Sequence, residues 1–210
     1  MPKVIPDFAH EEAAFAAGAR IVVGVDEVGR GPLAGPVTAA AVRLDPDNIP
    51  DGLADSKALT ARKREQLFSF LMAHATCAVA HASVEEIDRL NILNASHLAM
   101  RRAIARLAPD HALIDGNRLP PALSCPARTI IRGDTSCLSI AAASIVAKVT
   151  RDRLMVGLAQ QFPGYGWEKN AGYPTKQHRQ ALLNLGVTPW HRRSFAPIHN
   201  ILWQDISTSP

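Results

Sequence analysis

The chain has 210 residues and a formal net charge of +4, and 47% of its residues are hydrophobic and 20% charged. Such a composition is ordinary for a globular protein and allows one sizeable domain or two small ones. The longest apolar runs are too short to cross a membrane, and we find no secretory signal. Three widely spaced cysteines predict neither a zinc site nor a disulfide framework. We therefore expect a cytoplasmic protein with no membrane partner.

The charge is unevenly distributed along the chain. Residues 1–115 carry 12 Lys/Arg and 15 Asp/Glu, a net of −3, whereas residues 116–210 carry 11 Lys/Arg and 4 Asp/Glu, a net of +7. An acidic half suited to cations and a basic half suited to a polyanion are typical of a nucleic-acid enzyme. Random surface charge would explain the asymmetry equally well, so this feature decides nothing alone.

Hydrophobic periodicity predicts alternating strands and helices. In chain order we expect a helix over 7–19, strands over 20–26 and 36–44, a helix over 61–74, a strand over 76–84, a helix over 92–107, strands over 111–115 and 127–132, a long helix over 135–161 and a short basic helix over 175–185. The first two strands are expected to pair as an antiparallel hairpin. Segments 45–58 and 162–174 are predicted loops, and the tail from residue 188 is expected to be irregular or briefly helical.

This order of elements predicts a single mixed α/β unit, with a mixed sheet flanked by helices. We expect residues 1–150 to form the catalytic core and residues 151–210 to form a helical C-terminal subdomain packed on it. Nothing in the sequence indicates more than a monomer.

Four carboxylates stand where predicted strands end. Asp26 and Glu27 end the first strand, Asp115 ends the strand over 111–115, and Asp134 lies at the mouth of the long helix. Neighbouring strands would bring these acids together at one end of the sheet. Oxygen ligands suit Mg²⁺ or Mn²⁺ rather than zinc, and two such ions can serve phosphoryl transfer.

Each acid also has a structural explanation. Asp26 or Glu27 could be a turn residue or pair with Arg30, Asp115 could belong to an Asp-Gly turn, and Asp134 could cap the following helix. The four strand-end positions together favour the metal site more than any one of them does.

The turn after the first strand places Arg30 between Gly29 and Gly31, which lack side chains and so let a ligand approach the backbone. A nucleotide-binding P-loop is excluded, because Gly24-x-x-x-x-Gly29 is followed by Arg-Gly instead of Lys and Ser or Thr.

The run from Asp26 to Val37, DEVGRGPLAGPV, resembles the signature of the ribonuclease HII family. Further motifs follow in the order of that family: DSK at 55–57, IDG at 114–116, GD at 133–134, SIAAASIVAKVTRD at 139–152, GYPT at 172–175 and HRRSF at 191–195. The resemblance covers residues 20–198. Val28 stands where the family usually has alanine, and Arg132 replaces a frequent lysine.

The resemblance implies a ribonuclease H-like fold and an endonuclease that cleaves RNA in RNA–DNA hybrids. It also implies incision 5′ to single ribonucleotides embedded in duplex DNA, leaving 3′-hydroxyl and 5′-phosphate ends. A related metal-dependent nuclease of the same fold without junction specificity is the alternative. A hybrid-binding module without activity is disfavoured, because the set of acids is intact.

The resemblance also implies roles for individual residues. Asp26, Glu27, Asp115 and Asp134 would be the catalytic acids that bind two Mg²⁺ or Mn²⁺ ions. The backbone of Gly29, Arg30 and Gly31 would read the ribose 2′-hydroxyl. Tyr173 would stack on the sugar of the next deoxynucleotide, although a loop aromatic packed on Pro174 would look the same in sequence.

Basic residues elsewhere are candidates for phosphate contacts, which position a duplex without reading its sequence. These are Lys57, Lys148, Arg151, Lys176 and Arg179, and solvated surface charge accounts for about half of such residues.

Three remaining polar residues are given no direct part in the chemistry. We expect Asp152 to pair with Arg151 or Arg153 rather than to bind metal. His178 and His191 lack ligand spacing and are expected to be structural or surface residues. The tail 204–210 shows no motif for binding a sliding clamp.

Overall fold

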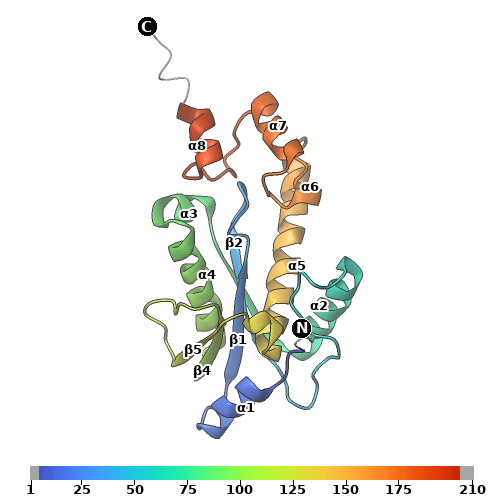
Figure 1. Ribbon diagram of the computed structural model, residues 1–210, viewed down its shortest axis with the longest axis vertical. Coiled ribbons are helices and arrows are strands. Elements are labelled where there is room, and N and C mark those ends of the chain that lie inside the picture. The colour runs from blue at the N-terminus through green and yellow to red at the C-terminus, as the bar shows by residue number, and fades with distance from the viewer. Residues whose placement is uncertain (1–4, 204–210) are drawn as a thin grey trace.

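The computed structural model describes residues 5–203. Within them, five strands form one mixed sheet in the order β3-β2-β1-β4-β5 (Figure 1). The strands are β1 (Val22–Val28), β2 (Val37–Arg43), β3 (Thr76–Ala82), β4 (His111–Asp115) and β5 (Ala127–Ile130). β2 pairs antiparallel with both β1 and β3, and β4 pairs parallel with both β1 and β5. The predicted hairpin of the first two strands is confirmed.

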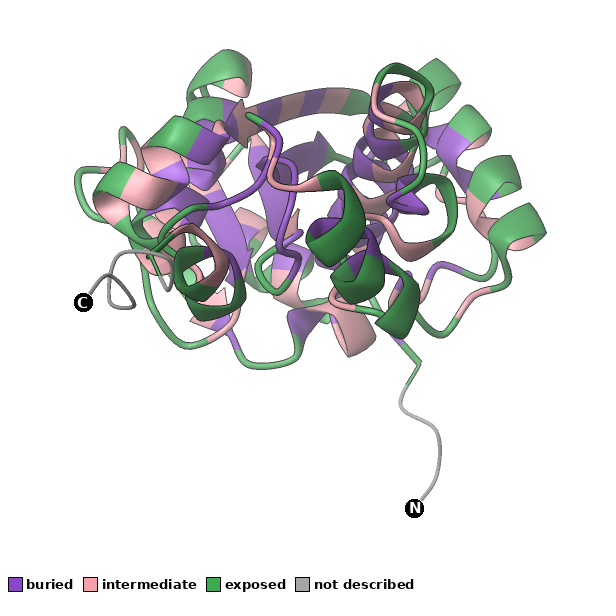
Figure 2. Ribbon diagram, turned by 90° about the horizontal axis from the view of Figure 1, so that it is seen from above, coloured by how far each residue is buried: buried purple, intermediate pink, exposed green. Residues whose placement is uncertain are grey.

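Helices cover both faces of this sheet. They are α1 (Ala9–Ala16), α2 (Ala61–His74), α3 (Val84–Leu90), α4 (Ile92–Leu107), α5 (Leu138–Gln161), α6 (Trp167–Asn170), α7 (Lys176–Leu185) and α8 (Ala196–Trp203), with a 3₁₀ turn at Gly133–Thr135. Viewed from above, the buried strands lie between the helical layers (Figure 2). α4 packs on one face and α5, with α2 beside it, packs on the other.

Alternation along β1 decides which residue meets which layer. Val23 and Val25 join the core cluster formed with α4. Gly24 faces α5, and a Cβ built there would lie 2.1 Å from the carbonyl carbon of Ser139. The alanine-rich first half of α5 can therefore approach the sheet closely only because β1 has a glycine at this point. The prediction that small residues bring this helix near the sheet is confirmed.

Several elements have the predicted bounds, and others begin or end at different residues. The helix over 61–74 and the strand over 111–115 have the predicted bounds, and Thr60 caps the helix through the Lys63 N–H. β5 ends at Ile130, not at residue 132, because Arg132 adopts a left-handed backbone with φ of 57°. β1 continues to Val28, two residues beyond the predicted end at residue 26, so both acids lie within the strand.

Two short helices were not predicted. α3 begins with a capping box in which the Ser83 hydroxyl accepts from the Glu86 N–H and the Glu86 carboxylate accepts from the Ser83 N–H. This Ser-x-x-Glu pattern is the sequence signal for the start of α3. α6 lies inside the predicted loop 162–174 and has only four residues, too few for periodicity to reveal.

The C-terminal helices α6, α7 and α8 gather at one end of the molecule (Figure 1). They enclose a hydrophobic cluster around Trp167 and Leu182, to which Met155 contributes from α5 and Leu33 from the loop after β1. The predicted division near residue 150 falls inside α5, so this helix belongs to both proposed parts. Among the helices described, none combines the length and apolarity that crossing a bilayer requires.

Candidate active site

The carboxylates lie where the parallel strands β1, β4 and β5 end. Val25 of β1 is level with Ile114 of β4, so Asp26 and Asp115 follow at the same height. Asp115 is level with Ile130, the last residue of β5. The Asp115 Oδ1 atom accepts a 2.7 Å hydrogen bond from the N–H of Gly133, which ties the segment carrying Asp134 to the end of β4. Strand ends thus place Asp26, Glu27, Asp115 and Asp134 along one edge.

Two surface cavities meet at this edge. One is lined by Glu27, Arg30 and His97, and the other by Asp55 and Asp134. Asp115 lines both cavities. A polymer lying along the edge could therefore pass all of these carboxylates.

Burial and nearby negative charges disfavour the charged forms of Asp26, Glu27 and Asp134. The pKa of Asp26, which is only 8% exposed, is raised well above its usual value by burial and then by the charges of Glu27 and Asp115. Burial also raises the pKa of Asp134, with Asp115 and Asp55 adding to the effect. Burial raises the pKa of Glu27 against the opposing charge of Arg30. The carboxylates at the strand ends thus carry more negative charge than the neighbouring basic side chains neutralise.

Few cations offset this charge. The Nη1 atom of Arg30 lies 3.3 Å from the Oε1 atom of Glu27, so the ion pair weighed from the sequence is present. Lys57 is exposed, and although burial opposes its charged form, the carboxylates of Asp55, Asp26 and Asp134 raise its pKa. The charges of these acids therefore act on the Lys57 ammonium group and favour its charged form.

The donor set suits a hard divalent cation. Every candidate ligand along the edge is a carboxylate oxygen, the type that Mg²⁺ and Mn²⁺ favour. Among residues 5–203, no three His, Cys, Asp or Glu side chains are grouped tightly enough to form a complete metal site by themselves. The excess charge at Asp26 is what an added cation would relieve.

The glycine turn lies against the predicted aromatic residue. A Cβ built on Gly31 would lie 3.3 Å from the Cε1 atom of Tyr173, so ring and turn are neighbours although 142 positions separate them in the chain. The Leu33 N–H donates a 2.8 Å hydrogen bond to the Gly172 carbonyl and holds the two loops together. Tyr173 is 39% exposed, so its ring is available at the surface.

Comparison with known proteins agrees with these features. The family described as Ribonuclease HII matches residues 23–199. The chain belongs to the ribonuclease HII family. It is 67% identical over 207 residues to the Ribonuclease HII of Cereibacter sphaeroides (strain ATCC 17025), an alignment that covers 98% of each chain. The predicted family and ribonuclease H-like α/β fold are confirmed, and the chain is an endoribonuclease.

Solved structures show the same fold. The ribonuclease H2 from Pyrococcus horikoshii OT3 is 28% identical and superposes with a TM-score of 0.74, covering 90% of this chain and 100% of that one. Bst-RNase HIII, solved in complex with Mn²⁺, is 20% identical and has a TM-score of 0.72 over 93% of this chain and 73% of its own. The latter likeness concerns the fold alone.

One predicted phosphate contact of this ribonuclease HII family member is wrong. Arg151 is fully buried in α5 and donates to the carbonyls of Pro36 at 2.9 Å, Ala171 at 2.9 Å and Ala34 at 3.1 Å. Its Nε atom lies only 2.2 Å from where a Cβ on Gly29 would be, and Gly29 has a φ of +93°. The side chain holds the glycine turn and cannot reach a phosphate.

A second buried arginine, Arg192, was missed in the sequence. It donates to the carbonyls of Gly29 at 2.6 Å, Arg30 at 3.0 Å and Gly35 at 2.9 Å. Burial lowers the pKa of Arg192 to about 9, and the neighbouring charge of Arg151 adds to the shift. The HRRSF motif is the only sequence signal for Arg192, because an arginine in a sequence is usually a residue of the exposed surface.

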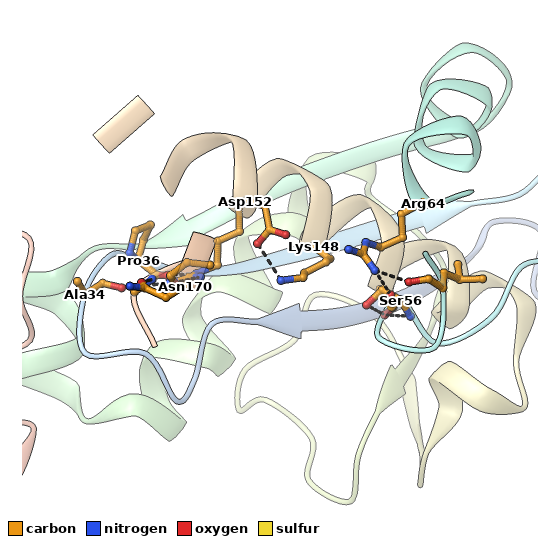
Figure 3. Close-up of polar contacts among 12 residues, drawn as sticks. Ala34, Pro36, Ser56, Arg64, Lys148, Asp152 and Asn170 are labelled. Atoms are coloured by element: carbon orange, nitrogen blue, oxygen red, sulfur yellow. Dashed lines mark hydrogen bonds and ion pairs between the residues drawn. The ribbon is translucent and has the colours of Figure 1, made fainter. Parts of the chain in front are cut away.

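Of the remaining basic candidates, Lys148 is partly buried and Lys57, Lys176 and Arg179 are exposed. Lys148 pairs with Asp152 one helical turn away, with 2.9 Å between the Nζ and Oδ1 atoms (Figure 3). The predicted pairing of Asp152 with Arg151 or Arg153 is therefore wrong, because Arg151 turns inward and Arg153 contacts Glu65. On α7, Lys176 and Arg179 are exposed.

Of the two possibilities expected for His178 and His191, structural or surface residues, the structure shows the first. His178 and His191 are buried, and their Nε2 atoms lie 3.0 Å apart. The Trp167 indole N–H donates to the same nitrogen of His178 at 3.1 Å. Burial lowers the pKa of His191 to about 3, so the pair stays neutral around pH 7. The Nδ1 atom of His178 contacts the Tyr173 carbonyl at 2.9 Å and supports the loop that carries that ring.

Proposed function

We propose that this chain hydrolyses the RNA strand of RNA–DNA hybrids and nicks duplex DNA 5′ to single embedded ribonucleotides, leaving 3′-hydroxyl and 5′-phosphate ends. The observation that carries the proposal is the contact between the turn at Gly31 and the ring of Tyr173, beside a row of carboxylates. One chain supplies the acids, the turn and the ring, so we propose that it acts as a monomer.

The acids Asp26, Glu27, Asp115 and Asp134 would hold two Mg²⁺ or Mn²⁺ ions. When bound, such a pair activates water and offsets negative charge on the leaving oxygen. The chain prepares two of the ligands by hydrogen bonds: the Gly133 N–H orients Asp115, and the Glu27 N–H donates to the Oδ1 atom of Asp26 at 2.8 Å. Preorganised ligands of this kind reduce the reorganisation that catalysis requires.

Recognition of the ribose would come from backbone groups. The 2′-hydroxyl both donates and accepts hydrogen bonds and is the group that distinguishes RNA from DNA. Gly31 is exposed and has no side chain, so a sugar can approach its amide closely. The Tyr173 ring beside it would stack on the following sugar and would crowd a second 2′-hydroxyl, which favours DNA at that position.

Basic side chains around the site would hold the phosphates of the duplex. The charges of Asp26 and Asp134 act on Lys57, Lys148 lies on α5, and Lys176 and Arg179 are exposed on α7. Such contacts would fix the duplex without reading its sequence and would make binding depend on salt.

A three-substrate assay tests the proposal. A DNA duplex with one internal ribonucleotide, a uniform RNA–DNA hybrid and an all-DNA duplex are each incubated with the protein and Mg²⁺ or Mn²⁺. We expect one nick 5′ to the ribonucleotide, cleavage throughout the hybrid and none in the all-DNA duplex. Cleavage indifferent to the ribose would identify a general nuclease of the same fold, and binding without cleavage would identify a hybrid-binding module.

A further inference from the structure

Arg192 is a buried cation that lacks an acidic partner. It is fully buried, and across residues 5–203 no carboxylate forms an ion pair with it. Its charge is met by the three backbone carbonyls of the glycine turn and by the Phe195 ring, whose centroid lies 5.1 Å from the guanidinium carbon. Burying a charge without an acidic partner is costly, and here only carbonyl hydrogen bonds and an aromatic ring offset that cost. We therefore look for a role of Arg192 in the loop that supplies these carbonyls.

The hydrogen bonds of Arg192 decide which way two consecutive peptide groups point. In a trans peptide the C=O of one residue and the N–H of the next point in opposite directions, and residues 5–203 contain no cis bond. The carbonyls of Gly29 and Arg30 point inward to the two terminal nitrogens of Arg192. The N–H groups of Arg30 and Gly31 must therefore point the other way.

These two N–H groups are free to meet a ligand. Within the part of the chain that the structure describes, neither N–H donates a hydrogen bond to another protein group. Arg30 and Gly31 are exposed, and the Tyr173 ring stands next to Gly31. Successive amides that point to one side form a concave donor site for oxygen atoms.

Arg151 completes the support from the other side. It holds the carbonyls of Ala34 and Pro36, which end the same loop, and the carbonyl of Ala171, two residues before Tyr173. Its hydrogen bonds join the glycine loop to the Tyr173 loop but leave the peptides at Arg30 and Gly31 to Arg192. The two arginines therefore have separable roles.

We propose that Arg192 is a positioning residue that presets the amides of Arg30 and Gly31 as paired donors toward the ribose 2′-hydroxyl of the substrate. Without it, peptides flanked by Gly29 and Gly31 can rotate readily, because glycine tolerates both signs of φ. A guanidinium bound to a carbonyl also polarises that peptide and strengthens its N–H as a donor. This inference rests on the proposed recognition of ribonucleotides.

The variant Arg192→Lys tests this role, because lysine keeps the charge but lacks the planar fork that reaches several carbonyls at once. Arg193→Lys is the matched control, since Arg193 is the next residue and is exposed. We expect the backbone amide NMR signals of Arg30 and Gly31 in the metal-free protein to shift or broaden in the first variant only. On a duplex with one ribonucleotide, kcat/KM should fall about 10- to 100-fold through a higher KM, since one or two hydrogen bonds are lost.

One further measurement separates positioning from general structural support. Mn²⁺ affinity, measured by calorimetry without nucleic acid, should differ less than about twofold between Arg192→Lys and the wild type, because the variant leaves the acids in place. Unchanged Arg30 and Gly31 signals in that variant, or equal effects of Arg193→Lys, would overturn the proposal.

The wild-type protein offers a test that needs no variant and remains decisive if Arg192→Lys does not fold. Without metal, a duplex containing one ribonucleotide should shift the amide signals of Arg30 and Gly31 more than an all-DNA duplex does. Equal shifts overturn the positioning role even if cleavage is normal. Failure of the wild type to cut at a ribonucleotide overturns the proposed function instead.

Discussion

Replacing Asp26 by asparagine should slow cleavage by orders of magnitude and stabilise the metal-free fold at the same time. The asparagine side chain keeps the oxygen that accepts the Glu27 N–H, so the local backbone is preserved. The substitution removes a charge that would bind the metal ions. Losing several kcal/mol of transition-state stabilisation, about 3–4 kcal/mol, corresponds to roughly a 10²- to 10³-fold fall in rate.

The stabilising effect follows from the raised pKa of Asp26, which burial causes first and Glu27 and Asp115 increase. Because the folded-state pKa lies above the unfolded one, ionising Asp26 opposes folding. The wild type therefore loses stability as pH rises from the usual carboxyl range through the raised pKa. The neutral amide avoids this loss, and relief of a buried like-charge contact is expected to contribute about 1 kcal/mol, or about 2–4 °C in Tm for a chain of this size.

Thermal unfolding in EDTA at a series of pH values measures this effect, with Asp47→Asn as the exposed control. The Tm of Asp26→Asn should match that of the wild type near pH 4 and exceed it at pH 7.5. Added Mg²⁺ should raise the Tm of the wild type and leave that of the variant nearly unchanged. A variant that is less stable than the wild type at pH 7.5, or a gap independent of pH, would refute the reasoning.

Three further outcomes are expected. Gly24→Ala should destabilise the fold by at least about 2 kcal/mol, because the new Cβ would lie 2.1 Å from the Ser139 backbone. Gly157→Ala is the control, because a Cβ at Gly157 would have no atom within 4 Å. Equal denaturation midpoints of the two variants would contradict the close packing of α5. Lys57→Ala should reduce the slope of log K against log salt by about 1, and an unchanged slope in binding titrations would remove Lys57 from the phosphate contacts. Tyr173→Ala should impair nicking at a single ribonucleotide more than cleavage of a uniform hybrid, and equal losses in kcat/KM would exclude junction sensing.

The candidate acids could be located from local sequence because their positions depend on short-range patterns. A run of apolar residues that ends in Asp26 and Glu27, and another that ends in Asp115, predict strands with carboxylates at their ends. Parallel pairing of β1 with β4 then brings Asp26 and Asp115 together, whatever the connecting helices are. The Thr60 cap is likewise a contact between residues three positions apart.

Contacts between distant segments could not be read in this way. Arg151 and Arg192 look like surface charges in the chain, and their burial depends on carbonyls more than 100 positions away. The partner of Asp152 depends on the same burial, since Arg151 turns inward and Lys148 is the residue that pairs with Asp152. α6 is too short to show a period of its own.

The sequence by itself determined the strands, the acids at their ends and the glycine turn, because strand periodicity and backbone freedom are local properties. Only the tertiary structure decided that the Tyr173 ring meets Gly31 and that Arg192 turns two peptide groups of that loop outward. Those contacts join the first strand to the C-terminal loops, and they exist only once the chain has packed around α5.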